Sequence, residues 1–175
     1  MEIDCQKLLG VEEAWWFRRR MKKLLPNRQI NVFHYEDGKD GLDRLIDFSD
    51  YIAISVPELR IVKPNTYKKD AVALARYCKK RKPTIDIHML GCTEYSMLKD
   101  IRFCTTADST SWLSGVKYGY FSDGIQKGHV NTIKQSILDE REVYLKPKTT
   151  DYCVKASLCA SMAKMRYTQL AGSQE

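Results

Sequence analysis

The sequence predicts an α/β protein in which parallel strands alternate with helices. Short apolar runs bounded by proline or glycine recur over the first two thirds of the 175-residue chain, and segments with helical spacing separate them. Such alternation is typical of a parallel sheet. A complete eight-stranded barrel needs roughly 200 residues or more. The residues alone therefore leave two architectures open, a small doubly wound domain or part of a barrel.

Five segments have the composition of buried strands. Each is short, rich in Ile, Val or other apolar residues, and bounded by turn-forming residues such as Pro57 or Gly91. About five parallel strands are predicted, over residues 1–5, 30–36, 51–57, 84–91 and 101–108.

Helical periodicity appears between these segments. One apolar stripe in residues 11–25 is formed by Ala14, Phe17, Met21 and Leu24. The same spacing predicts further helices over residues 40–48, 66–82 and 93–100, and helical segments over 123–142 and 151–170. The chain is therefore expected to consist of an α/β part, residues 1–120, and a helical C-terminal segment, residues 121–175, packed on it.

The composition narrows the class of protein. A formal net charge of +7 favours a polyanionic partner such as nucleic acid. No apolar run reaches the ~20 residues of a membrane span, and the N-terminus lacks the pattern of a signal peptide. None of the six cysteines forms a C-x-x-C pair, and the three histidines are scattered. We expect a cytoplasmic protein with reduced thiols that needs no metal or cofactor and does not bind a membrane.

Residues 15–23, WWFRRRMKK, combine aromatic with basic side chains. Such a cluster could follow phosphates and stack on bases. The helical stripe, however, turns the basic side chains to solvent. A plain solvated basic face is therefore the favoured interpretation of this segment.

Polar residues follow the predicted strands, where parallel sheets carry their functional groups. They are Asp4, His34, Ser55, the GCTE of residues 91–94, and Asp108 with Ser109–Ser111. Each of them also has a purely structural interpretation. Asp108, for example, precedes Ser-Thr-Ser and is typical of a helix cap or turn. Because the ends of parallel strands meet at one edge, the residues together predict a site.

The order of these strand-end motifs resembles the tRNA-guanine transglycosylase family, especially its phage and archaeal-like members linked to 7-deazaguanine modification. The similarity covers residues 1 to about 120 and is carried by MEIDCQ, INVFHYEDG, YIAISVPE, IHMLGCTE and TTADSTSW. It implies a partial (β/α)8 barrel that corresponds to the later half of the family's barrel. It also implies base exchange, in which a 7-deazaguanine base replaces guanine at a guanosine N-glycosidic bond in tRNA or DNA.

The resemblance assigns base recognition to four positions. Asp4 maps onto the family's Asp that reads the guanine-like base, and an ionised carboxylate is an acceptor that suits the two donors of guanine. His34 stands where bacterial members carry a base-contacting Gln. Ser55 falls at a glycine position whose backbone contacts the base, and Gly91 matches a glycine of the next strand.

The resemblance also places the nucleophile at the end of the last strand. Strict register puts Ser111 at the position of the family's reactive Asp, and Asp108 is the carboxylate available nearby. A carboxylate suits attack on C1′ better than a hydroxyl does, because it stabilises developing positive charge and is a competent leaving group. We therefore assign the role to Asp108. Lys117 falls where the family binds phosphate with Arg.

The early barrel strands of the family have no counterpart here. The resemblance thus implies a fragment or one half of a split enzyme, acting as a homo-oligomer or with a complementing subunit, since an open half-barrel leaves sheet edges unpaired. The alternative is a catalytically inactive nucleic-acid-binding or interaction protein on the same half-barrel. A doubly wound domain that binds a phosphorylated metabolite ranks last, because the first predicted strand is not followed by a Gly-rich phosphate loop.

Overall fold

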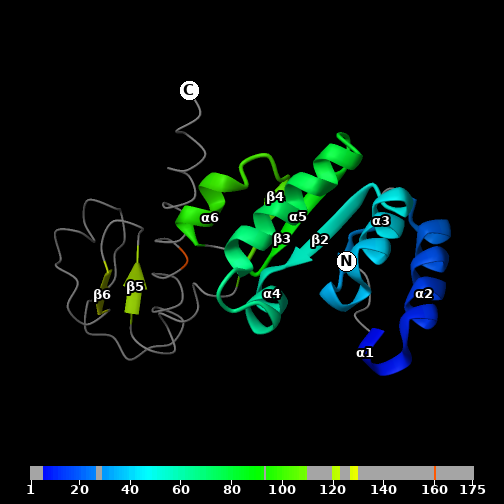
Figure 1. The fold of residues 1–175 in the computed structure, drawn as a ribbon, viewed down its shortest axis with the longest axis horizontal. Helices are drawn as coiled ribbons and strands as arrows, with labels where there is room; N and C mark the ends of the chain where they lie inside the picture. The colour runs from blue at the N-terminus through cyan, green and yellow to red at the C-terminus, as the bar shows by residue number, and fades with distance from the viewer. Residues whose placement is uncertain are drawn as a thin grey trace. The chain divides into compact units, whose positions relative to one another are not determined.

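The computed structural model describes residues 6–26, 29–92, 94–109, 120–122, 127–129 and 160. The chain divides into two compact units, Met1–Asp108 and Ser109–Glu175. The first unit contains a four-stranded parallel sheet made by β1 (Asn31–Phe33), β2 (Tyr51–Ser55), β3 (Asp86–Leu90) and β4 (Thr106–Ala107) (Figure 1). The α/β class with parallel strands is therefore confirmed.

Helices precede the sheet and connect its strands. They are α1 (Gln6–Leu9), α2 (Val11–Leu24), the 3-10 helix η1 (Tyr35–Asp37), α3 (Gly38–Phe48), α4 (Val56–Val62), α5 (Tyr67–Arg81) and α6 (Tyr95–Asp100). The helices predicted over 11–25, 40–48, 66–82 and 93–100 correspond to α2, α3, α5 and α6. The prediction missed α4, because Pro57 looked like the end of a strand. Proline is tolerated in the first turn of a helix, and here it lies in that turn of α4.

The strands follow chain order across the sheet, β1-β2-β3-β4, and every neighbouring pair is parallel. Doubly wound sheets instead reverse their strand order at a switch point. The sheet described here has no such reversal. All four carboxyl ends consequently lie at one edge, in the order in which the chain reaches them.

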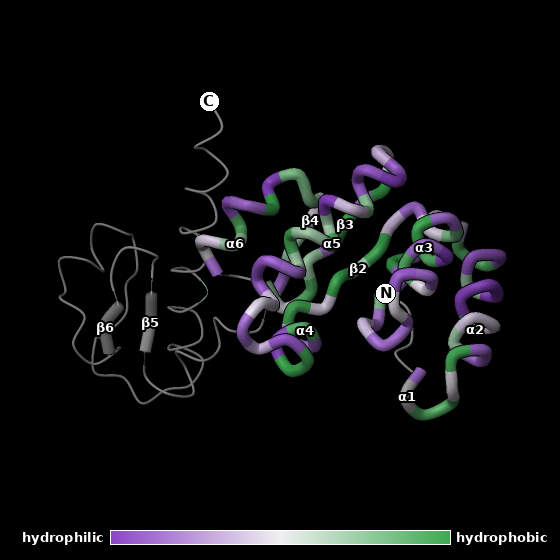
Figure 2. The backbone as a smooth tube through the Cα atoms, viewed as in Figure 1, coloured by the Kyte–Doolittle hydropathy of each residue, from purple (hydrophilic) through white to green (hydrophobic). Residues whose placement is uncertain are grey.

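One face of the sheet carries the hydrophobic core. Phe33, Ile54 and Met89 are paired across three strands, so their side chains share a face. They pack in one cluster with buried residues of α3 and α5, namely Leu42, Leu45, Ile46, Ala71, Ala75 and Cys78. Figure 2 shows the middle of β2 as hydrophobic, whereas α2 is mostly hydrophilic. Burial of this face is the main force that holds α3 and α5 on the sheet.

The opposite face changes character across the sheet. Val32, Ala53, His88 and Thr106 are register partners and form one row on this face. Val32 and Ala53 are buried, His88 is half-buried and Thr106 is exposed. The face is therefore apolar at β1 and β2 and polar at β3 and β4.

Helix α2 is attached to the sheet by a buried guanidinium. The Arg18 side chain is 2% exposed and donates a hydrogen bond to the Val32 carbonyl at 3.0 Å. Its guanidinium carbon also lies 4.9 Å from the centroid of the Trp15 ring. This anchorage turns the remaining basic residues of α2 away from the sheet.

All four strands of this sheet are shorter than predicted, and β1 and β4 are shortened most. In the segment 30–36, the strand ends at Phe33 and η1 follows, closed by a hydrogen bond from the Asp37 N–H to the His34 carbonyl. In the segment 101–108, Thr106–Ala107 alone are strand. Ile101 ends α6, since its N–H bonds to the Met97 carbonyl and its side chain packs in the core. The apolar residue at the start of this segment therefore belongs to the packing of a helix end. Over so few residues, an apolar helix end and a strand have similar compositions.

The second unit contains a two-stranded antiparallel sheet, β5 (Tyr120–Ser122) and β6 (Lys127–His129). The helix predicted over 123–142 is therefore wrong at 127–129. The sequence carries a signal that was overlooked, because Asp-Gly at 123–124 between two short runs favours a hairpin, and Gly128 disfavours a helix. Of the predicted helix 151–170 the structure describes Ala160, which is helical. The predicted strand 1–5 lies outside the described residues.

None of the helices in the described part of the chain combines the length and the apolar character that crossing a membrane requires.

Candidate active site

The carboxyl edge of the sheet brings four of the predicted site residues to neighbouring strand ends. His34 follows β1, Ser55 ends β2, Gly91 follows β3 and Asp108 follows β4. This arrangement follows directly from parallel strands in chain order. Asp4, Ser111 and Lys117 lie outside the described residues.

Asp108 is held through one carboxylate oxygen. Its Oδ1 accepts a hydrogen bond from the Gly91 backbone N–H at 2.9 Å. The Asp108 N–H donates to the Met89 carbonyl at 3.3 Å, which continues the β3–β4 pairing by one residue. The side chain remains 54% exposed. The strand end thus presents a carboxylate that is fixed in position and accessible to solvent.

His88 is a neighbour of this carboxylate that sequence reasoning did not single out. Its Nε2 lies 3.5 Å from Asp108 Oδ1, and its Nδ1 lies 2.7 Å from Thr106 Oγ1. The same Thr106 hydroxyl hydrogen-bonds the Tyr51 hydroxyl. The signal in the sequence was a polar residue between Ile87 and Met89, both of which face the core. Alternation within the strand places His88 on the opposite face.

Gly91 adopts a conformation that only glycine accommodates easily. Its φ is +68°, and a Cβ built there would lie 2.5 Å from Pro57 Cγ. The end of β3 therefore passes directly against the first turn of α4. Because the Gly91 N–H donates to Asp108, this close approach also sets the position of the carboxylate.

His34, Ser55 and Glu58 form a second group at the same edge. Ser55 caps α4, since its Oγ accepts a hydrogen bond from the Glu58 N–H at 3.3 Å. In a capping box the Glu would reach back to the cap residue. Glu58 reaches the residues that follow β1 instead, where Oε1 accepts from the Tyr35 N–H at 3.1 Å and Oε2 lies 3.5 Å from His34 Nδ1. Sequence reasoning missed Glu58, although the spacing Ser-x-x-Glu was visible.

A cavity of about 340 Å³ opens at this second group. Its polar lining includes His34, Ser55 and Glu58, and its apolar lining includes Ile61 and Val62. Ligand pockets have volumes of about 300–1,000 Å³, so the cavity is large enough for a small planar molecule. Ser55 pairs with Leu90 in the register. Because β3 lies between β2 and β4, the cavity and the Asp108 carboxylate are two strand spacings apart, about 9.5 Å in the sheet.

Metal ligands and reactive thiols do not come together in the described part of the chain. Its His, Cys, Asp and Glu side chains form no cluster of three or more suited to a metal ion. Burial raises the pKa of the Cys78 thiol to about 12 and that of Cys92 to about 11. Thiols of this kind are poor nucleophiles and behave as core residues.

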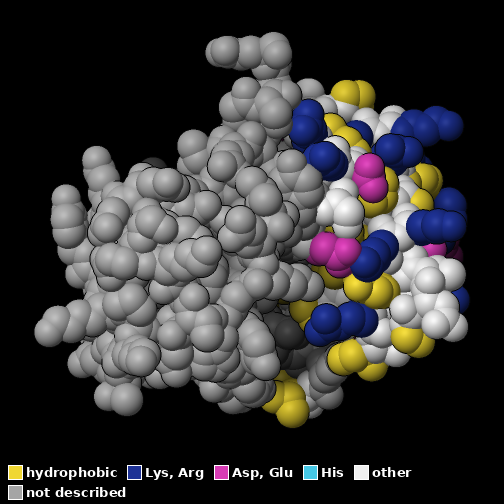
Figure 3. Space-filling view, turned by 90° about the vertical axis from the view of Figure 1, so that its left-hand side faces the viewer, with side chains coloured by type: hydrophobic (Ala, Val, Ile, Leu, Met, Phe, Trp, Pro, Cys, Tyr) yellow, Lys and Arg dark blue, Asp and Glu magenta, His cyan; other side chains and the backbone are white. Residues whose placement is uncertain are grey.

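Basic side chains are widespread on the surface. Figure 3 shows Lys and Arg over much of the described part of one face, with Asp and Glu among them. This distribution agrees with the formal net charge of +7. Such a surface attracts polyanions over several ångströms at low salt.

Comparisons with protein-family models, with curated proteins and with solved structures found no match to the chain. Fold and site together define an α/β protein with a carboxylate and a histidine at the carboxyl edge of a parallel sheet. Its function is therefore argued from these residues and their geometry.

Proposed function

We propose that this protein is similar in activity to the tRNA-guanine transglycosylases and exchanges guanine for a 7-deazaguanine at a guanosine N-glycosidic bond in tRNA or DNA. The observation that carries the proposal is the Asp108 carboxylate. It stands at the end of β4, fixed through Oδ1 by Gly91 and 54% exposed, and it is the carboxylate nearest in sequence to Ser111, which strict register with the family puts at the nucleophile position.

The sheet supports a partial (β/α)8 barrel as the framework. Barrel strands are parallel, follow chain order and carry their helices on one face, while the other face points inward. The sheet has this order, and its core lies on one face. We propose that the row containing Ala53, His88 and Thr106 faces inward. A second copy or a complementing subunit would complete the barrel, which light scattering would detect as an oligomer or a complex.

The reaction proceeds through a covalent sugar–enzyme intermediate. The target guanosine leaves its stack, and a carboxylate oxygen of Asp108 attacks C1′. The C1′–N9 bond breaks, and guanine departs with the electron pair and takes up a proton. The incoming 7-deazaguanine then attacks C1′ through its ring nitrogen and loses a proton, while Asp108 leaves as a carboxylate. The transition states have oxocarbenium character, which a neighbouring carboxylate stabilises.

The remaining groups bind and orient. The Gly91 N–H holds one carboxylate oxygen, which leaves the other directed at the sugar and lowers the reorganisation that the attack requires. The cavity at His34 and Ser55, at the same end of the sheet, is the proposed base site. Asp4 and Lys117 keep the roles that the resemblance implies, in base recognition and phosphate binding.

The test is Asp108→Asn, assayed by guanine release and by incorporation of labelled 7-deazaguanine into tRNA and into DNA. Asn keeps an oxygen acceptor for the Gly91 N–H, so stability should change by less than about 0.5 kcal/mol. The rate should fall by roughly 1,000-fold or more. The control is Asp86→Asn at the amino end of β3, where the carboxylate accepts a hydrogen bond from Thr105. Activity that survives Asp108→Asn unchanged would refute the nucleophile assignment.

A non-catalytic nucleic-acid-binding protein is the second candidate, and the same contact favours it. The hydrogen bond from Gly91 to Asp108 joins β4 to β3, which gives the carboxylate a structural role without chemistry. This alternative predicts salt-dependent binding of nucleic acid and no base release from the wild-type protein, alone or with a complementing subunit. Release of guanine would exclude it.

A further inference from the structure

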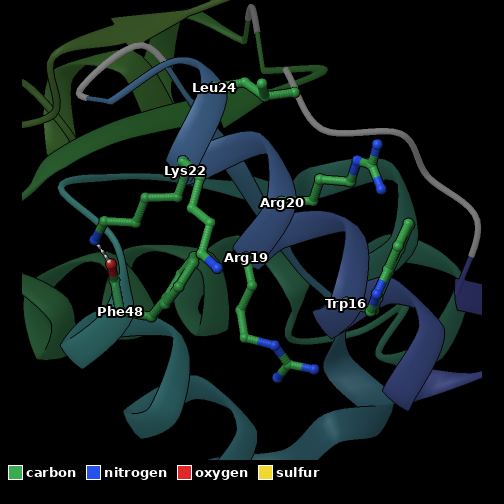
Figure 4. Close-up of a pocket in the computed structure, with 7 residues that line it drawn as sticks. Trp16, Arg19, Arg20, Lys22, Leu24 and Phe48 are labelled. Atoms are coloured by element: carbon green, nitrogen blue, oxygen red, sulfur yellow. Dashed lines mark hydrogen bonds between the residues drawn. The ribbon is translucent and has the colours of Figure 1, made fainter.

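A second hollow, of about 690 Å³, lies beside α2 and the end of α3 (Figure 4). Four cations and two aromatic rings line it, Arg19, Arg20, Lys22, Lys23, Trp16 and Phe48. We call it the α2 basic pocket. We propose that it binds the sugar–phosphate backbone of a single-stranded polynucleotide and stacks one unpaired base on Trp16.

The cations of the α2 basic pocket are available for phosphate. Arg19, Arg20 and Lys23 are exposed, and in the described part of the chain none of them forms an ion pair. In Figure 4, Arg20 extends beside Trp16, Lys22 reaches Phe48, and Arg19 lies between the two rings. A phosphate in the hollow would therefore meet several cations that no carboxylate of the described residues neutralises.

The aromatic rings of Trp16 and Phe48 line the hollow. Trp16 is 48% exposed, and the Arg20 guanidinium carbon lies 5.2 Å from its ring centroid. Phe48 is held by an edge-to-face contact with Trp15 at 5.4 Å and by the Lys22 ammonium 4.6 Å from its ring. Exposed rings next to cations are the usual platform for single-stranded nucleic acid, because every base has a face that can stack. A base paired within a duplex could not reach Trp16.

Helix electrostatics alone do not account for this arrangement. Lys22 and Lys23 lie in the last turn of α2, where the helix dipole favours cations. Arg19 and Arg20 precede that turn, so the dipole gives them little stabilisation. Arg19 and Arg20 instead line the hollow together with Trp16.

A bilayer fits this surface less well than a polynucleotide. A helix that lies on a membrane inserts a broad apolar face. The apolar side of α2 is already buried in the protein through Ala14 and Trp15. What α2 presents at the hollow is mainly cationic, with Trp16 and Leu24 as its exposed apolar groups.

The inference rests on the proposed function for the identity of its ligand, because a polynucleotide is the substrate that base exchange requires. It adds a second surface, away from the carboxyl ends of the β-strands. This surface would hold the polynucleotide during base exchange. Four phosphate contacts predict that log K falls with log salt with a slope of about −3, at ~0.7 per phosphate on a single strand.

The experiment measures binding of a fluorescent oligonucleotide of about 16 residues, as DNA and as RNA, by anisotropy over a salt series. Arg19→Ala/Lys23→Ala should weaken binding at least tenfold and reduce the salt slope by about 1.4. Trp16→Ala should weaken it by about 5- to 150-fold, with recovery in Trp16→Phe. The matched control is Arg76→Ala/Lys80→Ala on α5, which removes the same exposed pair at the same spacing and should weaken binding less than about twofold.

Each outcome bears on the proposal. Equal weakening by the α2 and α5 double variants would show diffuse attraction and overturn it. So would binding to phosphatidylserine vesicles that depends on Arg19 and Lys23 while oligonucleotide binding does not. Pocket-dependent binding without guanine release would retain the inference and reject the proposed function. Guanine release together with oligonucleotide binding that the α2 variants do not weaken would retain the proposed function and reject the inference. Circular dichroism would confirm that the variants fold.

Discussion

Replacing Gly91 with alanine tests the close approach of β3 to α4 on which the position of Asp108 depends. The new Cβ would lie 2.5 Å from Cγ and 2.6 Å from Cδ of Pro57. Both atoms belong to a ring that cannot rotate aside. The backbone would also have to keep a φ of +68°, which alanine disfavours.

These two effects have separable magnitudes. The left-handed conformation costs an alanine about 1–2 kcal/mol, and overpacking against the proline ring adds about 1–3 kcal/mol. Gly91→Ala should therefore lower the free energy of unfolding by about 2–5 kcal/mol. Pro57→Ala removes the colliding Cγ and Cδ atoms. In that background the Gly91 substitution should cost only the conformational part.

The assay is urea unfolding of the two single variants and the double variant, combined in a double-mutant cycle. We expect a coupling free energy of about 1–3 kcal/mol, since Pro57→Ala relieves the collision. Gly38→Ala is the control, because φ there is +63° and a Cβ added at Gly38 would meet nothing within 4 Å. It should combine additively with Pro57→Ala, within about 0.5 kcal/mol. A coupling below that value for Gly91 would refute the close approach. Base exchange should also slow in Gly91→Ala, because its N–H anchors Asp108.

Two further predictions concern titratable groups that have no role in the proposed reaction. Cys78 and Cys92 should resist alkylation at pH 8 in the folded protein and react on unfolding, because burial raises both thiol pKa values; peptide mapping after labelling would detect this, and native labelling at the rate of a free thiol would contradict it. The Tyr77 hydroxyl donates to Asp43 at 2.6 Å and is the main cause of the lowered pKa of that carboxyl. A lowered pKa stabilises the fold above the ordinary value of about 3.9, and this contribution is lost as pH falls through the folded-state pKa. Tyr77→Phe should therefore destabilise the protein at pH 6 and less so at pH 3. Equal destabilisation by Tyr77→Phe at the two pH values would contradict this reasoning.

Helices and strands were predictable where a single period extended over enough residues. The amphipathic spacing of α2, α3 and α5 located these helices to within about two residues of their bounds, which is the usual uncertainty of helix ends. Short apolar segments were more ambiguous. The segment 101–108 begins with Ile101, the C-cap residue of α6, and contains β4 near its end; over so few residues an apolar helix end and a strand have similar compositions.

The candidate site was predictable in part for a geometric reason. His34, Ser55, Gly91 and Asp108 follow consecutive parallel strands, so their arrival at one edge needed only the alternation of strands and helices. The partners of these residues were not predictable in the same way. Glu58 looked like a local capping residue, yet its carboxylate contacts Tyr35 and His34, which follow β1 more than twenty positions earlier in the chain.

The sequence by itself determined the α/β class, the alternation of strands with α2, α3, α5 and α6 in the first unit, and the polar residues at the ends of the strands. These properties depend on neighbouring residues, because periodicity and turn chemistry are local. The tertiary structure alone decided which strands are neighbours, that Pro57 meets Gly91, and that His88 lies 3.5 Å from Asp108. Such contacts join residues that are tens of positions apart. They exist only once the core has packed the sheet against α3 and α5, which is a property of the whole fold and of no single segment.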